Sequence, residues 1–283
     1  MFPYAHVQLG QVIASRYRVE EKLGEGGFGS VFRGTRLNDG AAIAMKCLDS
    51  ELQRNAVASA RFDREIEILR ELTHPGVPRV LDVVESDAAR LLIMEYVNGS
   101  SLAGHMARDA PFALHRALHI ATQLLDALDA VHLAGVLHRD VKPDNVVVGP
   151  NDSVVLVDFG VAAWRDAARN ADLTPAHTVM GTPRYAAPEQ VGGDAVDART
   201  DLFSVGVLFY EMLTGERPFP AVTAQGTAIA DSTMPPTPFA AYRQDLPDAL
   251  ERIVLRALAI KPEERFQNCA AFRNELRGLA VLT

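Results

Sequence analysis

The string HRDVKPDN occupies residues 138–145 and is followed by two apolar runs, VVV at 146–148 and VVLV at 154–157, the second ending in DFG at 158–160. Two short β-branched runs separated by a polar turn predict a hairpin. The ends of this hairpin would gather Asp140, Asn145 and Asp158. Because Mg²⁺ prefers carboxylate and phosphate oxygens as ligands, the stretch predicts a site for a metal and a phosphate group.

A glycine-rich loop, GEGGFGSV, lies upstream at residues 24–31. Its G-x-G-x-x-G spacing also occurs in dinucleotide-binding folds, where the loop opens a helix. Here residues 31–34 are strand-like and lead to a hairpin turn at 38–40. A strand–loop–strand flap that covers phosphates with backbone N–H groups fits this order better. A plain glycine-rich turn is the alternative.

A single lysine, Lys46, interrupts an otherwise apolar strand. A lone lysine on the solvent face of a strand is one interpretation. A buried lysine instead needs a partner, and the helical pattern at 62–72 offers Glu65. Asp63 and Glu67 should point elsewhere around that helix.

The remaining pattern divides the chain near residues 95–98. Residues 17–96 predict short strands with one helix, and the rest of the chain predicts mainly helices. The segment 200–213 is apolar nearly all round, which indicates a helix in the centre of a domain. The polar segment 161–180 has no convincing period, and such long irregular loops are usually functional. Further helices are predicted at 114–132, 250–259 and 270–279.

The composition narrows the class of protein. With 283 residues, the chain is large enough for one domain of two lobes. Its net charge of −8 argues against nucleic-acid binding. Two cysteines are too few for a disulfide framework, and Cys47 in its apolar strand is expected to be a buried, inert thiol. The sequence contains no apolar stretch long enough to span a membrane and no signal-peptide pattern. A cytoplasmic location follows, including the case of a cytoplasmic domain of a longer, membrane-anchored protein.

Together these motifs resemble the eukaryotic-type (Hanks-type) protein kinase family, most closely the bacterial Ser/Thr kinase domains. The resemblance covers residues 17–280 and includes MGTPRYAAPE at 180–189, together with Asp201 and Arg265. It implies an α+β, two-lobed kinase fold over residues 1–283. After an N-terminal extension (1–16) comes a small antiparallel N-lobe with one main helix (17–96), and then a larger, mainly helical C-lobe (97–281).

The resemblance also implies ATP as phosphate donor and Mg²⁺ as metal. The expected ATP-binding residues are Gly24, Gly26, Gly29, Val31, Ala44, Lys46, Met94, Glu95, Val97 and Val147. Lys46, paired with Glu65, would contact the α- and β-phosphates, while Asn145 and Asp158 would hold Mg²⁺. Asp140 would orient the substrate hydroxyl and take its proton. Lys142 would stabilise charge on the γ-phosphate.

Lys142 and Thr182, the latter in the substrate-docking segment, are similar to the Ser/Thr class rather than the Tyr class. Other positions are expected to be structural. Glu189 and Arg265 would form a buried ion pair, and Asp201 would cap the backbone of the catalytic loop. His138, Phe159, Leu69 and Val80 would form an apolar stack, whereas His105, His115, His119 and His132 are interpreted as packing or surface residues.

Regulation is predicted in the segment 158–189. Phosphorylation of Thr174 or Thr178 would add a charge that Arg139 can pair with, and so order the loop. The expected partners are proteins with Ser/Thr acceptors and a second kinase domain for autophosphorylation, but no nucleic acid. Two alternatives are a pseudokinase, which would lack a required Lys, Asp or Asn, and a small-molecule kinase, which would lack a segment like 181–189.

Overall fold

The computed structural model describes residues 7–26, 29–48, 66–67, 69–85, 90–158, 184–219 and 235–280. The described chain divides into two compact units. The first contains the described residues up to 73 and residues 78–97, and the second contains 74–77, 98–158 and the described residues from 184 onwards. The change from one unit to the other after Val97 lies within residues 95–98, where the sequence pattern changes.

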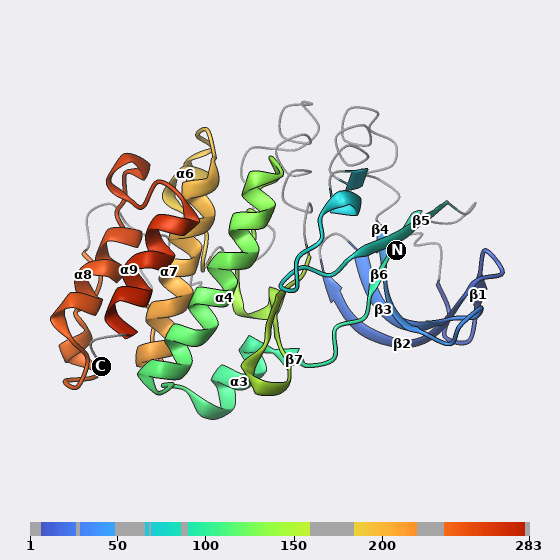
Figure 1. The fold of residues 1–283 in the computed structure, drawn as a ribbon, viewed down its shortest axis with the longest axis horizontal. Helices are drawn as coiled ribbons and strands as arrows, with labels where there is room; N and C mark the ends of the chain where they lie inside the picture. Colours follow the sequence, from blue (N-terminus) through green and yellow to red (C-terminus); the bar gives the residue numbers. More distant parts are fainter. Residues whose placement is uncertain are drawn as a thin grey trace. The chain divides into compact units, whose positions relative to one another are not determined.

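The first unit is built on an antiparallel sheet of six strands (Figure 1). The strands are β1 (Val12–Ile13), β2 (Tyr17–Gly26), β3 (Gly29–Arg36), β4 (Ala42–Leu48), β5 (Val80–Glu85) and β6 (Arg90–Glu95). Their order in the sheet is β1-β2-β3-β4-β6-β5. The turn between β3 and β4 uses Gly40 at φ 72°, a left-handed conformation that glycine adopts without steric cost.

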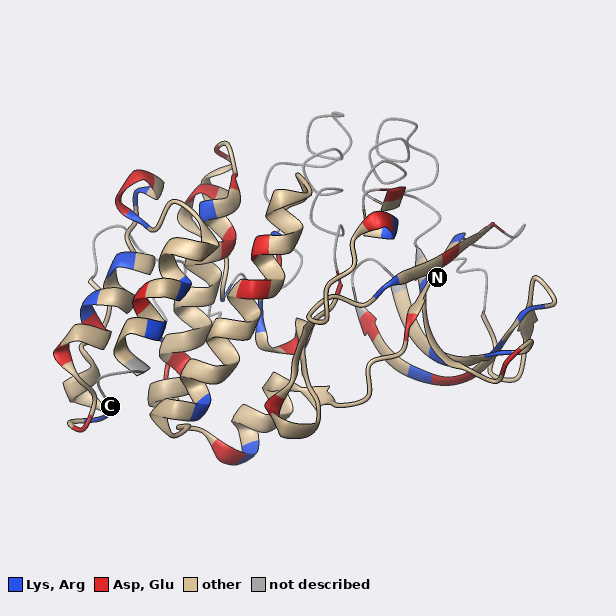
Figure 2. Cartoon of the chain, viewed as in Figure 1, with Lys and Arg blue, Asp and Glu red and all other residues tan. Residues whose placement is uncertain are grey.

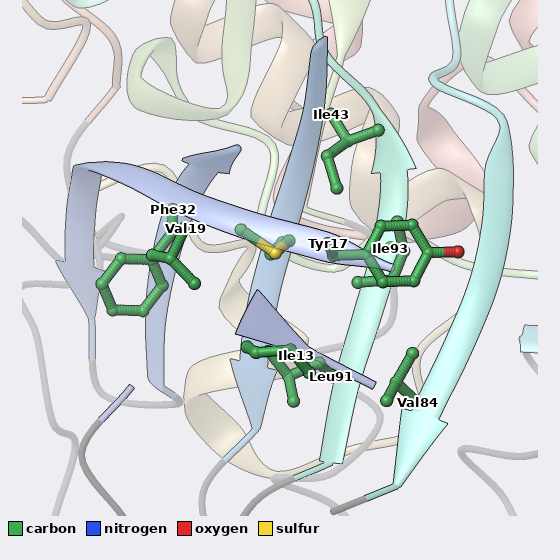
Figure 3. Packing of buried hydrophobic residues seen from close by; sticks show 9 residues of the cluster. Ile13, Tyr17, Val19, Phe32, Ile43, Val84, Leu91 and Ile93 are labelled. Carbon is green, nitrogen blue, oxygen red and sulfur yellow. The ribbon is translucent and has the colours of Figure 1, made fainter. Parts of the chain in front are cut away.

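The hydrophobic core of this unit lies on one face of the sheet (Figure 3). Its buried members are Ile13, Tyr17, Val19, Phe32, Ile43, Met45, Val84, Leu91 and Ile93. Because successive side chains of a strand point to opposite faces, Ala44 and Lys46 belong to the other face of β4. There Ile66 packs with Leu92 in a smaller buried cluster.

The second unit is mainly helical. Its helices are α3 (Leu102–Asp109), α4 (Leu114–Leu133), α6 (Pro188–Gly192), α7 (Ala198–Thr214), α8 (Asp248–Ala257) and α9 (Cys269–Ala280), with short 3₁₀ turns η1 (Pro143–Asn145), η2 (Pro150–Asp152), η3 (Phe239–Ala241) and η4 (Pro262–Glu264). Helix α7 is buried on nearly every side, as its apolar sequence predicts, and it packs against α4 and α8 (Figure 1). The Cβ that Gly206 lacks would lie 2.9 Å from the Cβ of Ala257, so glycine allows α7 and α8 to approach closely.

A small sheet places the predicted catalytic hairpin on this helical body. Strand β8 (Val146–Val148) pairs with β9 (Val154–Leu156) and with β7 (Ser100–Ser101). Gln123 of α4 donates to the carbonyl of Asp152 and accepts from the N–H of Val154, at 2.9 and 3.2 Å. Arg116 of α4 binds the Asp152 carboxylate at 3.0 Å. The hairpin is therefore fixed to α4 at its turn.

The sequence patterns missed some elements and misjudged one side chain. Helix α3 was not predicted, because Asn98-Gly99-Ser100 reads as a break, yet Ser101 caps this helix by accepting from the N–H of Gly104. The short strands β1 and β7 carry too few residues to show a period. The prediction that Cys47 is buried is wrong in degree. Its side chain is half-buried and packs against the core cluster of the first sheet.

Basic and acidic residues are interspersed along α4, α8 and α9 (Figure 2), and some pair with each other, such as Arg273 with Asp126 and Asp129. None of the helices in the described part of the chain is both long and apolar enough to cross a bilayer.

Candidate active site

The loop at 138–142 is held by one buried carboxylate. Asp201, in the first turn of α7, is fully buried. Its two oxygens accept hydrogen bonds from the backbone N–H groups of His138, at 2.9 Å, and Arg139, at 2.6 Å. The predicted cap on the catalytic loop is therefore present. Oδ2 of Asp201 also lies 2.7 Å from Nε2 of His132.

This carboxylate is ionised. Burial alone would raise the pKa of Asp201, but the hydrogen bond from the His132 ring, the positive charge that His132 and His138 gain when protonated, and the N–H of His138 outweigh it, so the pKa lies below its usual range. The negative charge of Asp201 helps to hold the backbone of Arg139, whose φ of 64° lies in the left-handed region. A non-glycine residue in this left-handed region costs about 1–3 kcal/mol, which the surrounding contacts must offset. The bond from Asp201 to the Arg139 N–H is one of them.

His138 is fixed from both ends of its ring. It is fully buried, its Nε2 donates to the carbonyl of Val157 at 2.9 Å, and its Nδ1 accepts from the N–H of Asp140 at 3.3 Å. The ring thus joins the catalytic loop to the end of β9. Gln190 of α6 adds a further tie by donating to the carbonyl of Arg139 at 2.8 Å.

Three of the predicted functional side chains meet at Asp140. Nζ of Lys142 lies 2.7 Å from Oδ2 of Asp140, and the amide nitrogen of Asn145 donates to the same oxygen at 3.1 Å and to the Asp140 carbonyl at 2.8 Å. Among the residues that the structure describes, both side-chain bonds to this carboxylate fall on Oδ2, and Oδ1 is the oxygen that remains to accept a proton. The amide nitrogen of Asn145 is used in holding Asp140, which leaves its side-chain carbonyl oxygen for a metal ion.

The hairpin brings the two predicted metal ligands to one end. Val146 pairs with Leu156, so Asn145, just before β8, and Asp158, just after β9, emerge at the same end of the strands. The N–H of Val157 donates to the carbonyl of Asn145 at 2.9 Å and closes this end. One carboxylate and one amide oxygen suit a cation that takes its other ligands from phosphate groups and water, as Mg²⁺ does. Among the described residues no cluster of three or more His, Cys, Asp and Glu side chains forms a protein-only metal site.

Four of the predicted ATP-binding residues of the first unit share the sheet face opposite the core. Val31 pairs with Lys46, and Ala44 pairs with Met94. Directly opposite residues of antiparallel strands point to the same side, so these four side chains lie together. Val31, Ala44 and Met94 are half-buried, and Lys46 is buried with 5% of its surface exposed.

The helical segment that would partner Lys46 packs on this same face. Lys46 pairs across β4 and β6 with Leu92, and Leu92 packs against Ile66 at the described start of that segment. Glu67 is exposed, in agreement with the expectation that it points away. Glu65, the predicted partner, lies outside the described residues.

The glycine-rich loop connects two strands. Gly26 of β2 pairs with Gly29 of β3, and β3 follows directly. A dinucleotide site would have a helix at this point, so the strand–loop–strand prediction is confirmed. At the other end of the sheet, the backbone N–H of Glu95 donates to the carbonyl of Arg79 at 3.0 Å. Any bond from the backbone of Glu95 to a nucleotide would therefore use its carbonyl oxygen.

The predicted ion pair under the catalytic loop is present and buried. Arg265 has no exposed surface, and its two terminal nitrogens bind the two oxygens of Glu189 at 2.7 and 2.8 Å. Thr200 donates to the same carboxylate at 2.8 Å. Burial raises the pKa of Glu189, but the bonds from Arg265 and Thr200 outweigh this and leave the pKa below its usual range.

Sequence reasoning missed two functional contacts. His132 was interpreted as a packing or surface residue, yet its ring is nearly buried and binds Asp201. The available signal was a polar side chain on the apolar stripe of α4. Gln190 gave no signal, because its partner is a backbone carbonyl 51 residues away in sequence. His115 and His119 are exposed and His105 is half-buried in a surface cluster with Arg116, as expected.

Several predicted residues lie outside the described part of the chain. They are Glu65, Phe159, Thr174, Thr178 and Thr182. The proposed roles of these residues remain predictions, as does the stack that includes Phe159. Gly24, Gly26, Gly29, Val97 and Val147 are described, and their roles in binding ATP are predictions.

In the second unit a buried aspartate caps an Asp-x-Lys-x-x-Asn loop, and the first unit carries a strand–loop–strand glycine flap. Both features are typical of a phosphotransferase of the kinase class. The chain belongs to the protein kinase family, because the protein kinase domain matches residues 17–275. The family and the two-lobed α+β fold expected from the sequence are thereby confirmed.

Relatives of this chain include bacterial serine/threonine-protein kinases. The serine/threonine-protein kinase pkn3 of Myxococcus xanthus is 39% identical over 96% of this chain, and the serine/threonine-protein kinase PknB of Mycobacterium tuberculosis is 35% identical over 93%. The kinase domain of Mycobacterium tuberculosis PknI has a similar crystal structure, with a TM-score of 0.76 and 29% identity over 98% of this chain and 100% of that one. The chain spans 51% of the length of pkn3 and 43% of PknB.

Proposed function

We propose that this domain transfers the γ-phosphate of ATP to serine and threonine hydroxyls of protein substrates. The observation that carries the proposal is the arrangement around Asp140, where Lys142 and Asn145 hold one carboxylate oxygen and leave the other. The relatives named as serine/threonine-protein kinases support the class of acceptor.

Asp140 is proposed to orient the acceptor hydroxyl and to take its proton. An ordinary aspartate, with a pKa of about 3.9, is a weak base toward an alcohol. The transition state of phosphoryl transfer is loose, so the hydroxyl loses its proton late and its position matters most. Lys142, already beside Asp140, is proposed to neutralise charge on the phosphoryl group as it moves.

We assign ATP binding to the glycine flap, with Gly24, Gly26 and Gly29, and to the face of the first sheet that carries Lys46. Val31, Ala44, Met94 and Val147 are proposed to contact the adenine ring, and the backbones of Glu95 and Val97 its polar edge. Lys46 is proposed to bind the α- and β-phosphates while paired with Glu65. A buried lysine needs such anionic partners.

Asn145 and Asp158 are proposed to hold Mg²⁺ through their side-chain oxygens. Bound between these residues, Mg²⁺ would supply positive charge that neutralises the phosphate groups. The chain's own contribution is to fix both ligands at the same end of the β8–β9 hairpin, which Gln123 and Arg116 attach to α4.

The direct test is incubation of the protein with γ-labelled ATP, Mg²⁺ and generic protein substrates, followed by identification of the labelled amino acid. Phosphoserine and phosphothreonine are expected. Label found only on tyrosine would refute the Ser/Thr assignment. Nucleotide binding without any transfer would instead support the pseudokinase alternative.

We further propose that the domain phosphorylates Thr174 or Thr178 of a second copy of itself, and that Arg139 then pairs with the phosphate. Phosphopeptide mapping after incubation with Mg·ATP tests this autophosphorylation. If neither threonine is modified, or if the double alanine variant is fully active, autophosphorylation at these sites is wrong.

A cytoplasmic location is proposed on the ground that ATP and two free cysteines suit a reducing compartment.

A further inference from the structure

Cys269 is a buried thiol to which the catalytic scheme gives no role. It opens helix α9, and only 1% of its surface is exposed. Its sulfur lies 3.4 Å from Nδ1 of His132, on the side of the imidazole ring opposite the bond to Asp201. The thiol, the ring and the carboxylate thus form one line that joins α9, α4 and α7.

The position of the hydrogen atoms in this line follows from the environment of the sulfur. Burial raises the pKa of Cys269, and the negative charges of Asp129 and Asp201 raise it further, so the thiol keeps its proton. An S–H group is a weak donor and sulfur a weak acceptor. In a ring that carries a single proton, Nδ1 of His132 then accepts from the thiol, and the proton sits on Nε2, where it donates to Asp201.

The line ends beside the reacting residue. Asp201 binds the N–H groups of His138 and Arg139, and Asp140 follows immediately. A ring with its proton on Nδ1 would turn an electron pair toward the Asp201 carboxylate and lose the 2.7 Å bond. The carboxylate would then be free to move, and Arg139 would lose part of the support for its left-handed backbone.

We propose that Cys269 is a positioning residue for phosphoryl transfer, which acts by holding the imidazole of His132 with its proton on Nε2. The proposal rests on the proposed kinase function for its kinetic consequence, but the state of the ring can be observed without any turnover.

The first test is long-range ¹H–¹⁵N correlation spectroscopy of the histidine rings, in which the His132→Gln variant identifies the His132 signals. In the wild type we expect a neutral ring protonated on Nε2. In Cys269→Val, which keeps the bulk but has no S–H group, a mixture of the two ring forms should appear. A doubly protonated ring, or a ring protonated on Nδ1, in the wild type at neutral pH would overturn the proposal.

The second test is steady-state kinetics with three replacements at this position. Cys269→Ser keeps a donor and should retain the wild-type kcat, whereas Cys269→Val and Cys269→Ala should lower kcat about 3–10-fold, the effect of one lost hydrogen bond. KM for ATP should not change. Cys47→Ser, a replacement of the half-buried cysteine of β4, is the matched control and should behave as the wild type.

The outcomes separate the two proposals. Absence of transfer by the wild type refutes the kinase function and leaves the ring measurement valid. A Cys269→Val variant as active as Cys269→Ser refutes the role of the thiol while the kinase function stands. If Cys269→Val does not fold, Cys269→Ala and the wild-type spectrum decide the question.

Discussion

Replacement of Arg265 by methionine is expected to destabilise the second unit strongly. The variant removes a guanidinium that binds both oxygens of Glu189 and also donates to the carbonyls of Ala259, at 2.7 Å, and Ile260, at 2.9 Å. The methionine fills much of the space but leaves the Glu189 carboxylate buried with Thr200 as a remaining partner. Loss of one member of a buried ion pair costs about 3–5 kcal/mol, and we expect a loss in this range at pH 7.

The effect should depend on pH in a defined direction. In the wild type the pKa of Glu189 is depressed, so the pair contributes its full stability above the ordinary glutamate pKa of about 4.3 and loses it as pH falls through the lower folded pKa. Without Arg265, burial raises the pKa of Glu189, and the variant can take up a proton as the pH falls. The difference in the free energy of unfolding should therefore shrink between pH 7 and pH 4.

Urea denaturation followed by circular dichroism at these two pH values measures this difference. The control is Lys261→Ala, which removes an exposed pair with Glu264 at 3.2 Å and should change stability by less than about 0.5 kcal/mol. The double variant Glu189→Leu/Arg265→Met removes both charges and should recover most of the loss. A loss below about 1 kcal/mol at pH 7, or an equal loss at both pH values, would refute this explanation of the pair.

Three further predictions concern single side chains. Asp201→Asn should lower kcat at least about tenfold, because an amide has one acceptor oxygen for two loop N–H groups, and kinetics with an unchanged kcat would contradict the capping role. Burial raises the pKa of Glu211 despite the bond from Tyr185, so the wild type loses stability as pH rises from the ordinary glutamate pKa of about 4.3 toward the raised pKa. Glu211→Gln should therefore gain stability relative to the wild type over this rise in pH, and melting curves with a constant difference would refute this. Gly206→Ala should destabilise the folded protein by about 1–3 kcal/mol, because its Cβ meets Ala257. Gly278→Ala in α9, where a Cβ meets nothing within 4 Å, should stabilise it by about 0.5–1 kcal/mol. Equal effects in denaturation curves would contradict the close approach of α7 and α8.

The sequence alone predicts the strands and helices whose residues show a clear periodicity or turn signal. The strands β2 to β6 alternate or carry turn signals, and α4 and α7 show their apolar faces directly. Helix α3 escaped because its start looks like a loop, and only the cap from Ser101 explains where it begins. Short elements such as β7 exist because they pair with β8, which no local pattern reveals.

The candidate site likewise combines residues that the sequence predicts with supporting contacts that it does not. Asp140, Lys142, Asn145 and Asp158 lie within 19 residues of one another, and the hairpin between them brings them together predictably. The supports of the loop come from far along the chain. His132 meets Asp201 69 residues away, and Cys269 meets His132 137 residues away, so these contacts follow from the packing of α4, α7 and α9. A polar residue on an apolar helix stripe is the one local sign of such a contact.

Asp140 and the groups that hold it should make this domain a working kinase rather than a nucleotide-binding scaffold. The most direct measurement compares Asp140→Asn with the wild type in two assays on the same preparations, Mg·ATP binding by calorimetry and transfer of labelled phosphate to protein. We expect equal ATP affinity and a loss of at least about 100-fold in kcat for the variant. An Asp140→Asn variant that transfers phosphate at the wild-type rate would contradict this expectation.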